Sequence, residues 1–264
     1  MPPAPLITDL HTHDFAAGGL LLVDKPKGYT SFDVVNKLRY RLRRITGVKR
    51  IKVGHSGTLD PMATGLLLIA TGKATKALTA LTGLPKAYTG TVTFGATTPS
   101  YDAETAREGD YPTAHLTEAL LTAAIDDHLT GEIEQLPPIY SAIKVGGQRA
   151  YRAARAGQDI KLEPRRVRVE RFDLTGVRLT HDDLAHGDLA HGDLPEADFC
   201  VEVSKGTYVR SLAHDLGRLA GSGAYLSTLR RTRIGGYDVA HARSLDAIVA
   251  ELERRLPRAP SSDR

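Results

Sequence analysis

The chain has very little cysteine and no long apolar run, and each shortage excludes a class of protein. Cys200 is the only cysteine among 264 residues, which rules out an intramolecular disulfide and a cysteine-based metal site. No apolar stretch approaches the roughly 18 residues that a membrane-spanning helix needs. The N-terminus, MPPAP, lacks the basic and apolar regions of a signal peptide. We therefore expect a cytoplasmic protein.

Motifs for binding nucleotide cofactors are also missing. Gly65 and Gly72 are separated by six residues instead of the four of a phosphate-binding loop, and Ala74 stands where Ser or Thr would bind magnesium. No glycine fingerprint of a dinucleotide-binding turn is present. The sequence thus predicts neither a cofactor nor a metal.

What the chain does contain is an ordinary globular composition, 41% hydrophobic and 25% charged, enough for one large domain or two small ones. Apolar periodicity predicts strands at 20–23, 66–70, 87–94, 166–174 and 199–203, and helices at about 31–44, 116–128, 209–219 and 245–256. These elements mix without a βαβ rhythm. We therefore expect an α+β fold with a central, mostly antiparallel mixed sheet flanked by helices.

The most informative stretch is residues 54–65, with the sequence GHSGTLDPMATG. Its glycines let the backbone bend sharply, and Pro61 fixes φ after Asp60, so the carboxylate is presented on a stiff corner. Asp followed by Pro is also typical of a helix N-cap. However, Gly65 comes only five residues later, and the apolar run at 66–70 indicates a buried strand. We expect Asp60 on a loop that leads into a core strand, as a reacting group.

This stretch resembles the catalytic motif of the TruB family, the bacterial tRNA pseudouridine synthases that act on uridine 55 of the T arm. Three further segments resemble family motifs in the same order within residues 18–235: 19–28 (GLLLVDKPKG), 138–144 (PIYSAIK) and 204–210 (SKGTYVR). The resemblance implies the pseudouridine synthase catalytic fold. It also implies isomerisation of uridine in tRNA by base flipping, with no cofactor.

Roles for individual residues follow from the same resemblance. Asp60 is the essential aspartate, whether it attacks C1′, adds to C6 or assists elimination. Tyr208 lies against the target base near C5, and Arg210 pairs with Asp60. Two residues apart in an extended segment, Tyr208 and Arg210 would share one face while Val209 points into the core.

The rest of the implied pocket handles the extruded base. Tyr88 matches the tyrosine that stacks on the flipped uracil, His55 matches the residue beside the rearranged loop, and Leu229 closes the pocket on its apolar side. Without the resemblance, Tyr88 at a strand start would be interpreted as a core residue.

A basic stretch precedes the Asp60 loop. Residues 37–52 hold eight Lys and Arg and no acidic residue. Such a run is typical of a solvated helix face, but its position here indicates a track for a phosphate backbone. We expect RNA contacts from Arg41, Arg43 and Arg44, and from Lys144 in the third motif.

The expected domain organisation is a flexible tail at 1–17, a catalytic domain at 18–243 and a helix with tail at 244–264. The RNA-binding domain that many family members append is not expected. A charged insertion at 181–194 (HDDLAHGDLAHGDL) is interpreted as an exposed loop, with a weak metal site as the alternative. The expected partner is the tRNA T stem-loop, bound by a monomer with no obligate protein partner and no membrane.

Two other function classes stay open at this point. A tRNA-binding or RNA-folding protein could use the same basic surface with catalysis secondary. A metal-dependent hydrolase could use the His-rich segments, although no ligand spacing supports it.

Overall fold

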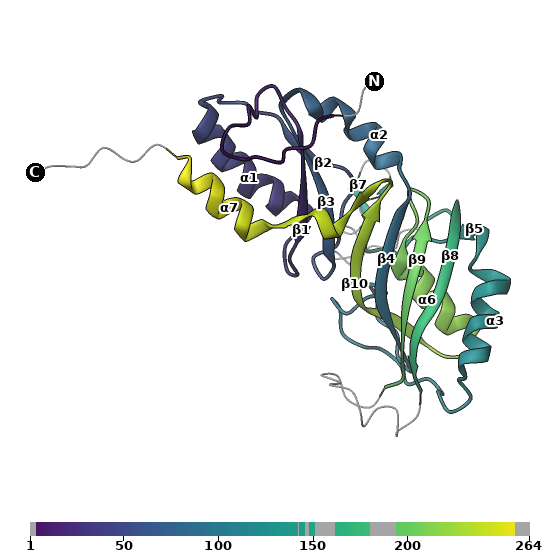
Figure 1. The fold of residues 1–264 in the computed structure, drawn as a ribbon. Helices are drawn as coiled ribbons and strands as arrows, with labels where there is room; N and C mark the ends of the chain where they lie inside the picture. The colour runs from purple at the N-terminus through teal and green to yellow at the C-terminus, as the bar shows by residue number, and fades with distance from the viewer. Residues whose placement is uncertain (1–3, 142, 146–147, 151–161, 180–193, 257–264) are drawn as a thin grey trace, which may run out of the picture. The chain divides into compact units, whose positions relative to one another are not determined.

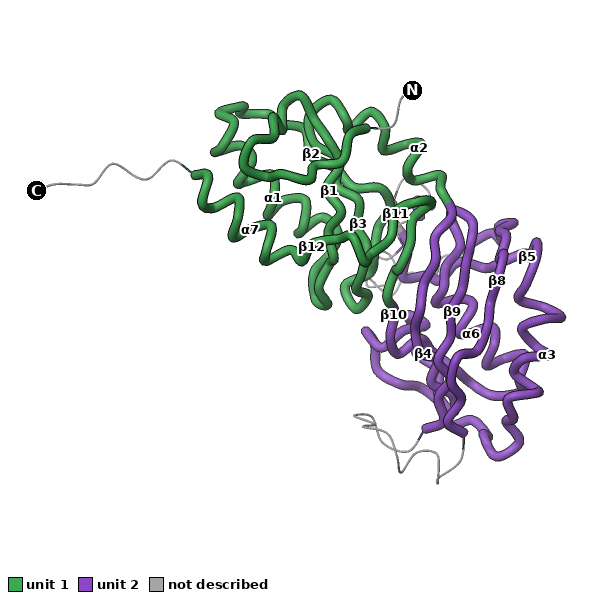
Figure 2. Tube along the Cα trace, viewed as in Figure 1, with its two compact units in different colours: residues 1–84, 230–264 green, residues 85–229 purple. Residues whose placement is uncertain are grey.

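The structure, a computed structural model, describes residues 4–141, 143–145, 148–150, 162–179 and 194–256. The chain divides into two compact units: unit 1 holds residues 1–84 and 230–264, and unit 2 holds residues 85–229 (Figure 2). The expected insertion at 181–194 lies outside the described residues except for Leu194.

Most of the helices and strands are labelled in Figure 1, and all of them follow one another in this order. They are β1 (Leu20–Lys25), α1 (Ser31–Thr46), β2 (Val53–His55), β3 (Thr64–Thr71), the 3₁₀ helix η1 (Gly72–Ala77), α2 (Leu78–Gly83), β4 (Lys86–Phe94), α3 (Glu118–His128), β5 (Gly131–Gln135), β6 (Lys144–Val145), β7 (Gln148–Arg149), β8 (Arg165–Arg178), β9 (Glu196–Val203), α6 (Val209–Leu219), β10 (Ala224–Ile234), β11 (Tyr237–Asp238), η2 (Val239–His241), β12 (Arg243–Ser244) and α7 (Leu245–Arg254).

The sheet of unit 1 is organised around β3. The strand order is β12–β1–β3–β10, with β2 also paired to β3 and β11 to β10. The β1–β3 pair is antiparallel, whereas β1–β12 and β3–β10 are parallel. Strand β10 enters unit 1 at Arg230, which pairs with Thr64. The α+β class and the mixed sheet are therefore confirmed.

Both faces of β3 are covered, which explains why its sequence is apolar without alternation. Leu67 and Ile69 pack with α1 and α7 on one face. Leu66, Leu68 and Ala70 point to the other face, toward η1 and α2. The two-residue period of a strand thus sorts one apolar run into two separate cores.

Helix α1 begins and ends at recognisable signals. Thr30 caps its N-terminus in a reciprocal capping box with Asp33, and Gly47 ends it in the left-handed region at φ 70°. The buried face consists of Val34, Val35, Leu38 and Leu42. The basic residues of this helix therefore lie away from its core-facing stripe.

The N-terminal segment differs from the expected flexible tail. Leu10 and Phe15 are fully buried and belong to the core that α1 and α7 cover. The backbone of Ile7 donates a 2.8 Å hydrogen bond to the Leu20 carbonyl in β1. Proline-rich composition suggested a tail here, but three apolar side chains at 7, 10 and 15 suffice to fold the segment onto unit 1.

In unit 2, strand β9 lies between β4 and β8, with β5 at the edge beyond β8. Phe199, Val201 and Val203 are buried on one face of β9, as the alternation predicts, while Cys200 is only partly buried. Phe199 meets Phe172 of β8 edge to face, with ring centroids 5.5 Å apart. Helices α3 and α6 contact each other on this unit (Figure 1).

Candidate active site

Asp60 lies on the loop that joins β2 to β3 in unit 1, as predicted. Residues 60–63 form a turn in which the Ala63 amide donates to the Asp60 carbonyl at 3.1 Å, and no helix starts at Pro61. The helix-cap alternative is therefore excluded. Leu59 and Met62 on either side are buried, whereas Asp60 is partly exposed. Anchored apolar neighbours thus hold a carboxylate that solvent or substrate can reach.

A buried serine at the start of α1 fixes the approach to Asp60. Ser31 is 1% exposed, and its Oγ accepts a 2.8 Å hydrogen bond from the Leu59 amide. The same hydroxyl lies 3.2 Å from the Leu59 carbonyl, to which it can donate. One side chain therefore satisfies both backbone groups of the residue before the aspartate.

A buried arginine holds the other side of the loop. Arg231 is 1% exposed, and its guanidinium donates to the carbonyls of Leu66 (2.7 Å), Gly57 (3.2 Å) and Thr58 (3.4 Å). No carboxylate pairs with it among the described residues. The Arg231 backbone also packs on Gly65, where an added Cβ would collide with the Arg231 carbonyl. Arg231 thus ties the beginning of the loop to the strand that follows it.

Lys25 supports the turn at residues 60–63 through hydrogen bonds. Its side chain is fully buried, and Nζ donates to the carbonyls of Tyr29 (2.7 Å) and Pro26 (3.0 Å), with the Pro61 carbonyl at 3.5 Å. The second predicted motif, GLLLVDKPKG, thereby contacts the residue next to Asp60. Two motifs far apart in sequence meet at this loop.

His55 ends β2 immediately before the loop, opposite Ile69 of β3. Burial lowers its pKa, the Arg231 charge lowers it further, and a backbone hydrogen bond with Gly57 raises it. Its Nδ1 is buried without a hydrogen-bond partner among the described residues. A neutral imidazole is therefore the stable form, which suits a packing role beside the loop.

In unit 2, Arg210 is buried but does not lie in an extended segment as the two-residue spacing predicted. It is in the first turn of α6, which begins at Val209, and Tyr208 is the N-cap with φ −101° and ψ 109°. The same-face argument for Tyr208 and Arg210 is therefore wrong. The Leu212 amide bonds to the Tyr208 carbonyl at 3.2 Å, so the chain becomes helical directly after Tyr208.

Arg210 is surrounded by acceptors, including one carboxylate. Its Nη1 donates to the Ser100 carbonyl at 2.9 Å and its Nη2 to the Tyr140 carbonyl at 3.0 Å. The Nε atom lies 3.5 Å from Oδ2 of Asp102, which is 1% exposed. Asp102 is itself fixed by the Ser100 hydroxyl at 2.6 Å and the Glu104 amide at 2.9 Å. The guanidinium is thereby locked in one orientation.

The backbone of Tyr208 is clamped by a buried glutamine. Gln135 is 1% exposed, its Oε1 accepts from the Tyr208 amide at 2.8 Å, and its Nε2 donates to the Tyr208 carbonyl at 3.0 Å. The tyrosine is only partly buried. These two hydrogen bonds fix the backbone from which the Tyr208 side chain projects, while the residue stays partly exposed.

The other two residues expected in the base pocket belong to unit 2. Tyr88 lies on β4 opposite Val201 of β9 and is partly buried. Leu229 is 8% exposed and is the last residue of unit 2 on β10. Their contacts with a base stay predictions.

The basic residues predicted to meet RNA differ in their surroundings. Arg41 is engaged by Glu253 of α7, with Nε 3.0 Å from Oε1, and its Nη1 donates to the Lys37 carbonyl. Arg43 and Arg44 are exposed, and the Arg44 guanidinium lies 5.7 Å from the Tyr40 ring centroid. Lys144 is on β6, and its side chain lies outside the described residues.

Sequence reasoning missed four residues: Ser31, Arg231, Asp102 and Gln135. Only Arg231 left a signal, since alternation along β10 puts this charged residue on the same buried face as Leu229. The others are polar residues without periodicity.

Two further features of the described residues bear on the alternatives. Among the described residues, no group of three His, Cys, Asp or Glu side chains is placed to hold a metal ion. No helix within the described ranges is both long and apolar enough to cross a bilayer.

Comparison with known proteins identifies the family. A model described as the TruB family pseudouridylate synthase N-terminal domain matches residues 43–209, and one described as the tRNA pseudouridylate synthase B C-terminal domain matches residues 210–256. The tRNA pseudouridine synthase B of Flavobacterium johnsoniae is 49% identical over 230 residues, covering 87% of this chain and 93% of that protein. That of Arthrobacter sp. strain FB24 is 46% identical over 235 residues, covering 89% and 72%.

Solved structures agree with the sequence relatives. The matched chain in the crystal structure of a Cbf5–Nop10–Gar1 complex superposes with a TM-score of 0.62 at 26% identity, over 94% of this chain and 61% of that chain. An archaeal box H/ACA Nop10–Cbf5 complex gives 0.60 at 25% identity, over 96% and 58%. With the family model and the relatives taken together, the chain belongs to the TruB family of pseudouridine synthases.

Proposed function

We propose that the protein isomerises uridine to pseudouridine at position 55 in the T loop of tRNA. The reaction breaks the N1–C1′ glycosidic bond, rotates the uracil and joins its C5 to C1′, so atoms and electrons balance within the nucleotide. The observation that carries the proposal is the Asp60 corner, a carboxylate on a loop anchored by Ser31 and Arg231. Relatives named tRNA pseudouridine synthase B support the choice of tRNA.

In this proposal Asp60 is the group that reacts with the target nucleotide. It attacks C1′, adds to C6 or takes a proton from the ribose, and each route needs a fixed carboxylate with a small, constant reach. Tyr208 helps to remove the proton from C5. Arg210 orients the catalytic carboxylate, as the resemblance implies.

Extraction of the base from the folded RNA costs stacking energy, which the protein must replace. Tyr88 supplies an aromatic face for the flipped uracil, and Leu229 closes the apolar side. His55, neutral because of its burial, packs beside the loop without adding charge. The detached uracil is thereby retained long enough to rotate.

The partner in this proposal is tRNA, bound by a monomer in the cytoplasm through the basic stretch at 37–52. No cofactor takes part because the isomerisation is redox neutral and transfers no group between molecules. Extensive dialysis against EDTA is expected to leave turnover of a folded transcript unchanged.

The decisive experiment replaces Asp60 with Asn, which keeps the size of the side chain and removes its charge and basicity. We expect turnover to fall below detection while tRNA affinity stays within roughly tenfold of the parent. Asp126→Asn, on the exposed face of α3, is the matched control and is expected to behave as the parent. Pseudouridine is measured by mapping at single-nucleotide resolution.

Two results would contradict the proposal. Substantial turnover by pure Asp60→Asn protein would remove the aspartate from the chemistry. A parent protein that refolds tRNA but makes no pseudouridine would favour the alternative, an RNA-folding protein in which catalysis is secondary.

A further inference from the structure

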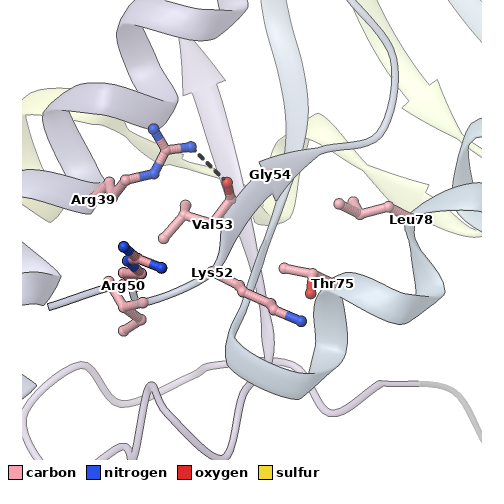
Figure 3. A pocket seen from close by; sticks show the side chains of 8 residues that line it. Arg39, Arg50, Lys52, Val53, Gly54, Thr75 and Leu78 are labelled. Carbon is pink, nitrogen blue, oxygen red and sulfur yellow. Dashed lines mark hydrogen bonds between the residues drawn. The ribbon is translucent and has the colours of Figure 1, made fainter. Parts of the chain in front are cut away.

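An open pocket in unit 1 is lined by residues of the basic stretch 37–52 and of the segments that follow it. It has a volume of about 440 Å³ and lies where α1, the segment entering β2 and the η1–α2 stretch meet. Three basic side chains line it, from Arg39, Arg50 and Lys52. Figure 3 shows Arg39 and Arg50 on one side and the Lys52 side chain extending toward Thr75 on the other.

The pocket is cationic and, among the described residues, has no acidic residue in its lining. The Arg39 guanidinium is held in place, with Nη2 donating to the Val53 carbonyl at 2.9 Å and Nη1 to the Asn36 side-chain oxygen at 3.0 Å. These acceptors are neutral, so they orient the guanidinium without cancelling its charge. No ion pair within the described ranges engages Arg50 or Lys52.

The chemistry of the lining residues restricts the class of ligand that the pocket can bind. A planar guanidinium and a lysine ammonium together match the oxygens of a phosphate group. Another part of the lining is apolar and includes Val53 and Leu78. Inorganic phosphate has no apolar surface to place there, whereas a nucleotide backbone has its sugar. The chemistry therefore fits a phosphodiester with its ribose better than a free anion.

The pocket is also connected to the candidate active site through one short strand. Gly54 lines the pocket and belongs to β2, His55 follows it, and Asp60 comes about six residues after Gly54. That length of chain spans at most about 20 Å. The phosphates of one strand of double-stranded DNA are spaced by roughly 3.4 Å along the helix axis, and on that spacing the reach corresponds to about six nucleotides.

We propose that this pocket, which we call the β2 phosphate pocket, binds one phosphodiester of the tRNA backbone within about six nucleotides of the isomerised uridine. This inference rests on the proposed function for the identity of the RNA. The pocket fixes the register of the RNA on unit 1, so that the nucleotide presented to Asp60 is set by its spacing from a bound phosphate.

The first test compares two double variants that each remove two positive charges. Arg50→Ala with Lys52→Ala empties the pocket of exposed cations and leaves Arg39, which joins α1 to β2, in place. Lys73→Ala with Lys76→Ala removes two exposed lysines of the adjacent η1 that do not line the pocket. Binding of a T stem-loop RNA is measured across a range of salt concentrations.

We expect the pocket variant to bind about 10-fold to 30-fold more weakly near 0.15 M salt, with its log–log salt slope flattened by about 0.7 to 0.9, the value for one lost phosphate contact. The η1 variant is expected to stay within about threefold. Equal losses in the two variants would overturn the proposal, because they would show a diffuse field and no site.

The second test locates the phosphate. A set of T stem-loop RNAs, each with one neutral methylphosphonate, is titrated against the parent and the pocket variant. We expect one position within about six nucleotides of the target to weaken binding to the parent and to have no further effect on the variant. A methylphosphonate penalty that is the same for both proteins at every position would overturn the proposal.

A third variant pair addresses the pocket from another element. Thr75→Glu adds a carboxylate to the lining, whereas Thr75→Gln adds a side chain of similar size without charge. We expect about a 10-fold loss of RNA affinity for Glu and little for Gln. Equal effects would indicate disruption of the wall and contradict a phosphate site. These readouts are all binding measurements, so they remain distinct from a failure of the proposed isomerisation.

Discussion

Arg231 in unit 1 and Arg210 in unit 2 are both buried, but different groups hold them. Within the described part of the chain, Arg231 donates only to backbone carbonyls, those of Gly57, Thr58 and Leu66. Arg210 donates to two carbonyls as well, but its Nε also lies beside the buried Asp102 carboxylate. Both arrangements supply hydrogen-bond acceptors to the guanidinium. They differ because a carboxylate compensates the charge of Arg210, whereas neutral carbonyls surround Arg231.

The difference indicates two tasks. A guanidinium among carbonyls fixes the backbone, and its positive charge stays available to the region around it. A guanidinium beside a carboxylate is oriented as a side chain, and much of its charge is compensated locally. Arg231 is therefore suited to holding the Asp60 loop, and Arg210 to presenting one directed set of donors next to Tyr208.

The largest effect is expected from the residue beside Arg210. Tyr208→Phe keeps the aromatic face and the Gln135 clamp, which uses only backbone atoms, and removes the hydroxyl. If the phenol moves the C5 proton, single-turnover isomerisation should fall by about 100-fold or more with RNA affinity within about threefold. Gln135→Met, which should loosen the same residue without touching its hydroxyl, is the comparison. Turnover of the phenylalanine variant at the parent rate would remove the proton-transfer role.

The carboxylate that distinguishes Arg210 from Arg231 can be removed directly. Asp102→Asn puts an amide where the buried guanidinium has a negative partner, and breaking a buried pair costs about 3–5 kcal/mol of unfolding free energy. We expect a clearly lowered midpoint of thermal unfolding, and turnover reduced by about 100-fold in the protein that remains folded. Glu104→Gln, an exposed neighbour on the same loop, is the control. An unchanged unfolding midpoint would show that the position of Arg210 does not depend on the Asp102 carboxylate.

The sequence predicts the secondary structure and the Asp60 corner, but it does not predict the hydrogen bonds that hold the corner, and the reason is physical. Glycine and proline spacing predicted the Asp60 corner, and apolar periodicity predicted the long helices and the strands β1, β3, β4, β8 and β9, because both signals are local. The 11-residue strand β10 was not predicted. The bonds that hold the corner are not local. Arg231 contacts residues 165 to 174 positions away in the chain, and Gln135 lies 73 positions before Tyr208.

The wrong prediction at Tyr208 and Arg210 has the same origin. A two-residue spacing was interpreted as a strand, although the helix expected from 209 onward already included Arg210. A motif identifies residues that act together without stating the backbone that brings them there. The N-terminal segment shows the same limit of local signals. Its composition is typical of a tail, yet Leu10 and Phe15 pack into the core formed with α1 and α7.

A smaller effect is expected from the carbonyl-bound arginine, and it separates position from charge. Arg231→Lys keeps the charge but cannot span three carbonyls as a planar fork does, whereas Arg231→Met removes both. Because a lone buried charge is itself costly, Met need not destabilise the fold strongly, even though the loop loses its anchor. We expect kcat to fall by about 10-fold for Lys and up to about 100-fold for Met.

The KM of both Arg231 variants should stay within about threefold, since this residue is 1% exposed and can hardly touch RNA. Arg230→Lys, at the neighbouring position in β10, is the matched control. Its partner Asp24, 2.7 Å from the Arg230 guanidinium, can pair with a lysine ammonium as well. A rise in KM with kcat unchanged would contradict a role in holding the loop.

The smallest effect is expected from Arg43 and Arg44, the exposed arginines of α1. Arg43→Ala with Arg44→Ala should weaken tRNA binding by only a few-fold and flatten its salt slope by about one to two, with saturating turnover close to the parent. Adding Arg41→Ala should lower stability as well, because Arg41 joins α1 to Glu253 of α7. A triple variant that binds tRNA normally at all salt concentrations, with only turnover reduced, would show that these arginines are not part of the RNA track. The electrostatic contribution would then come from elsewhere on unit 1, where the β2 phosphate pocket is the site to test first.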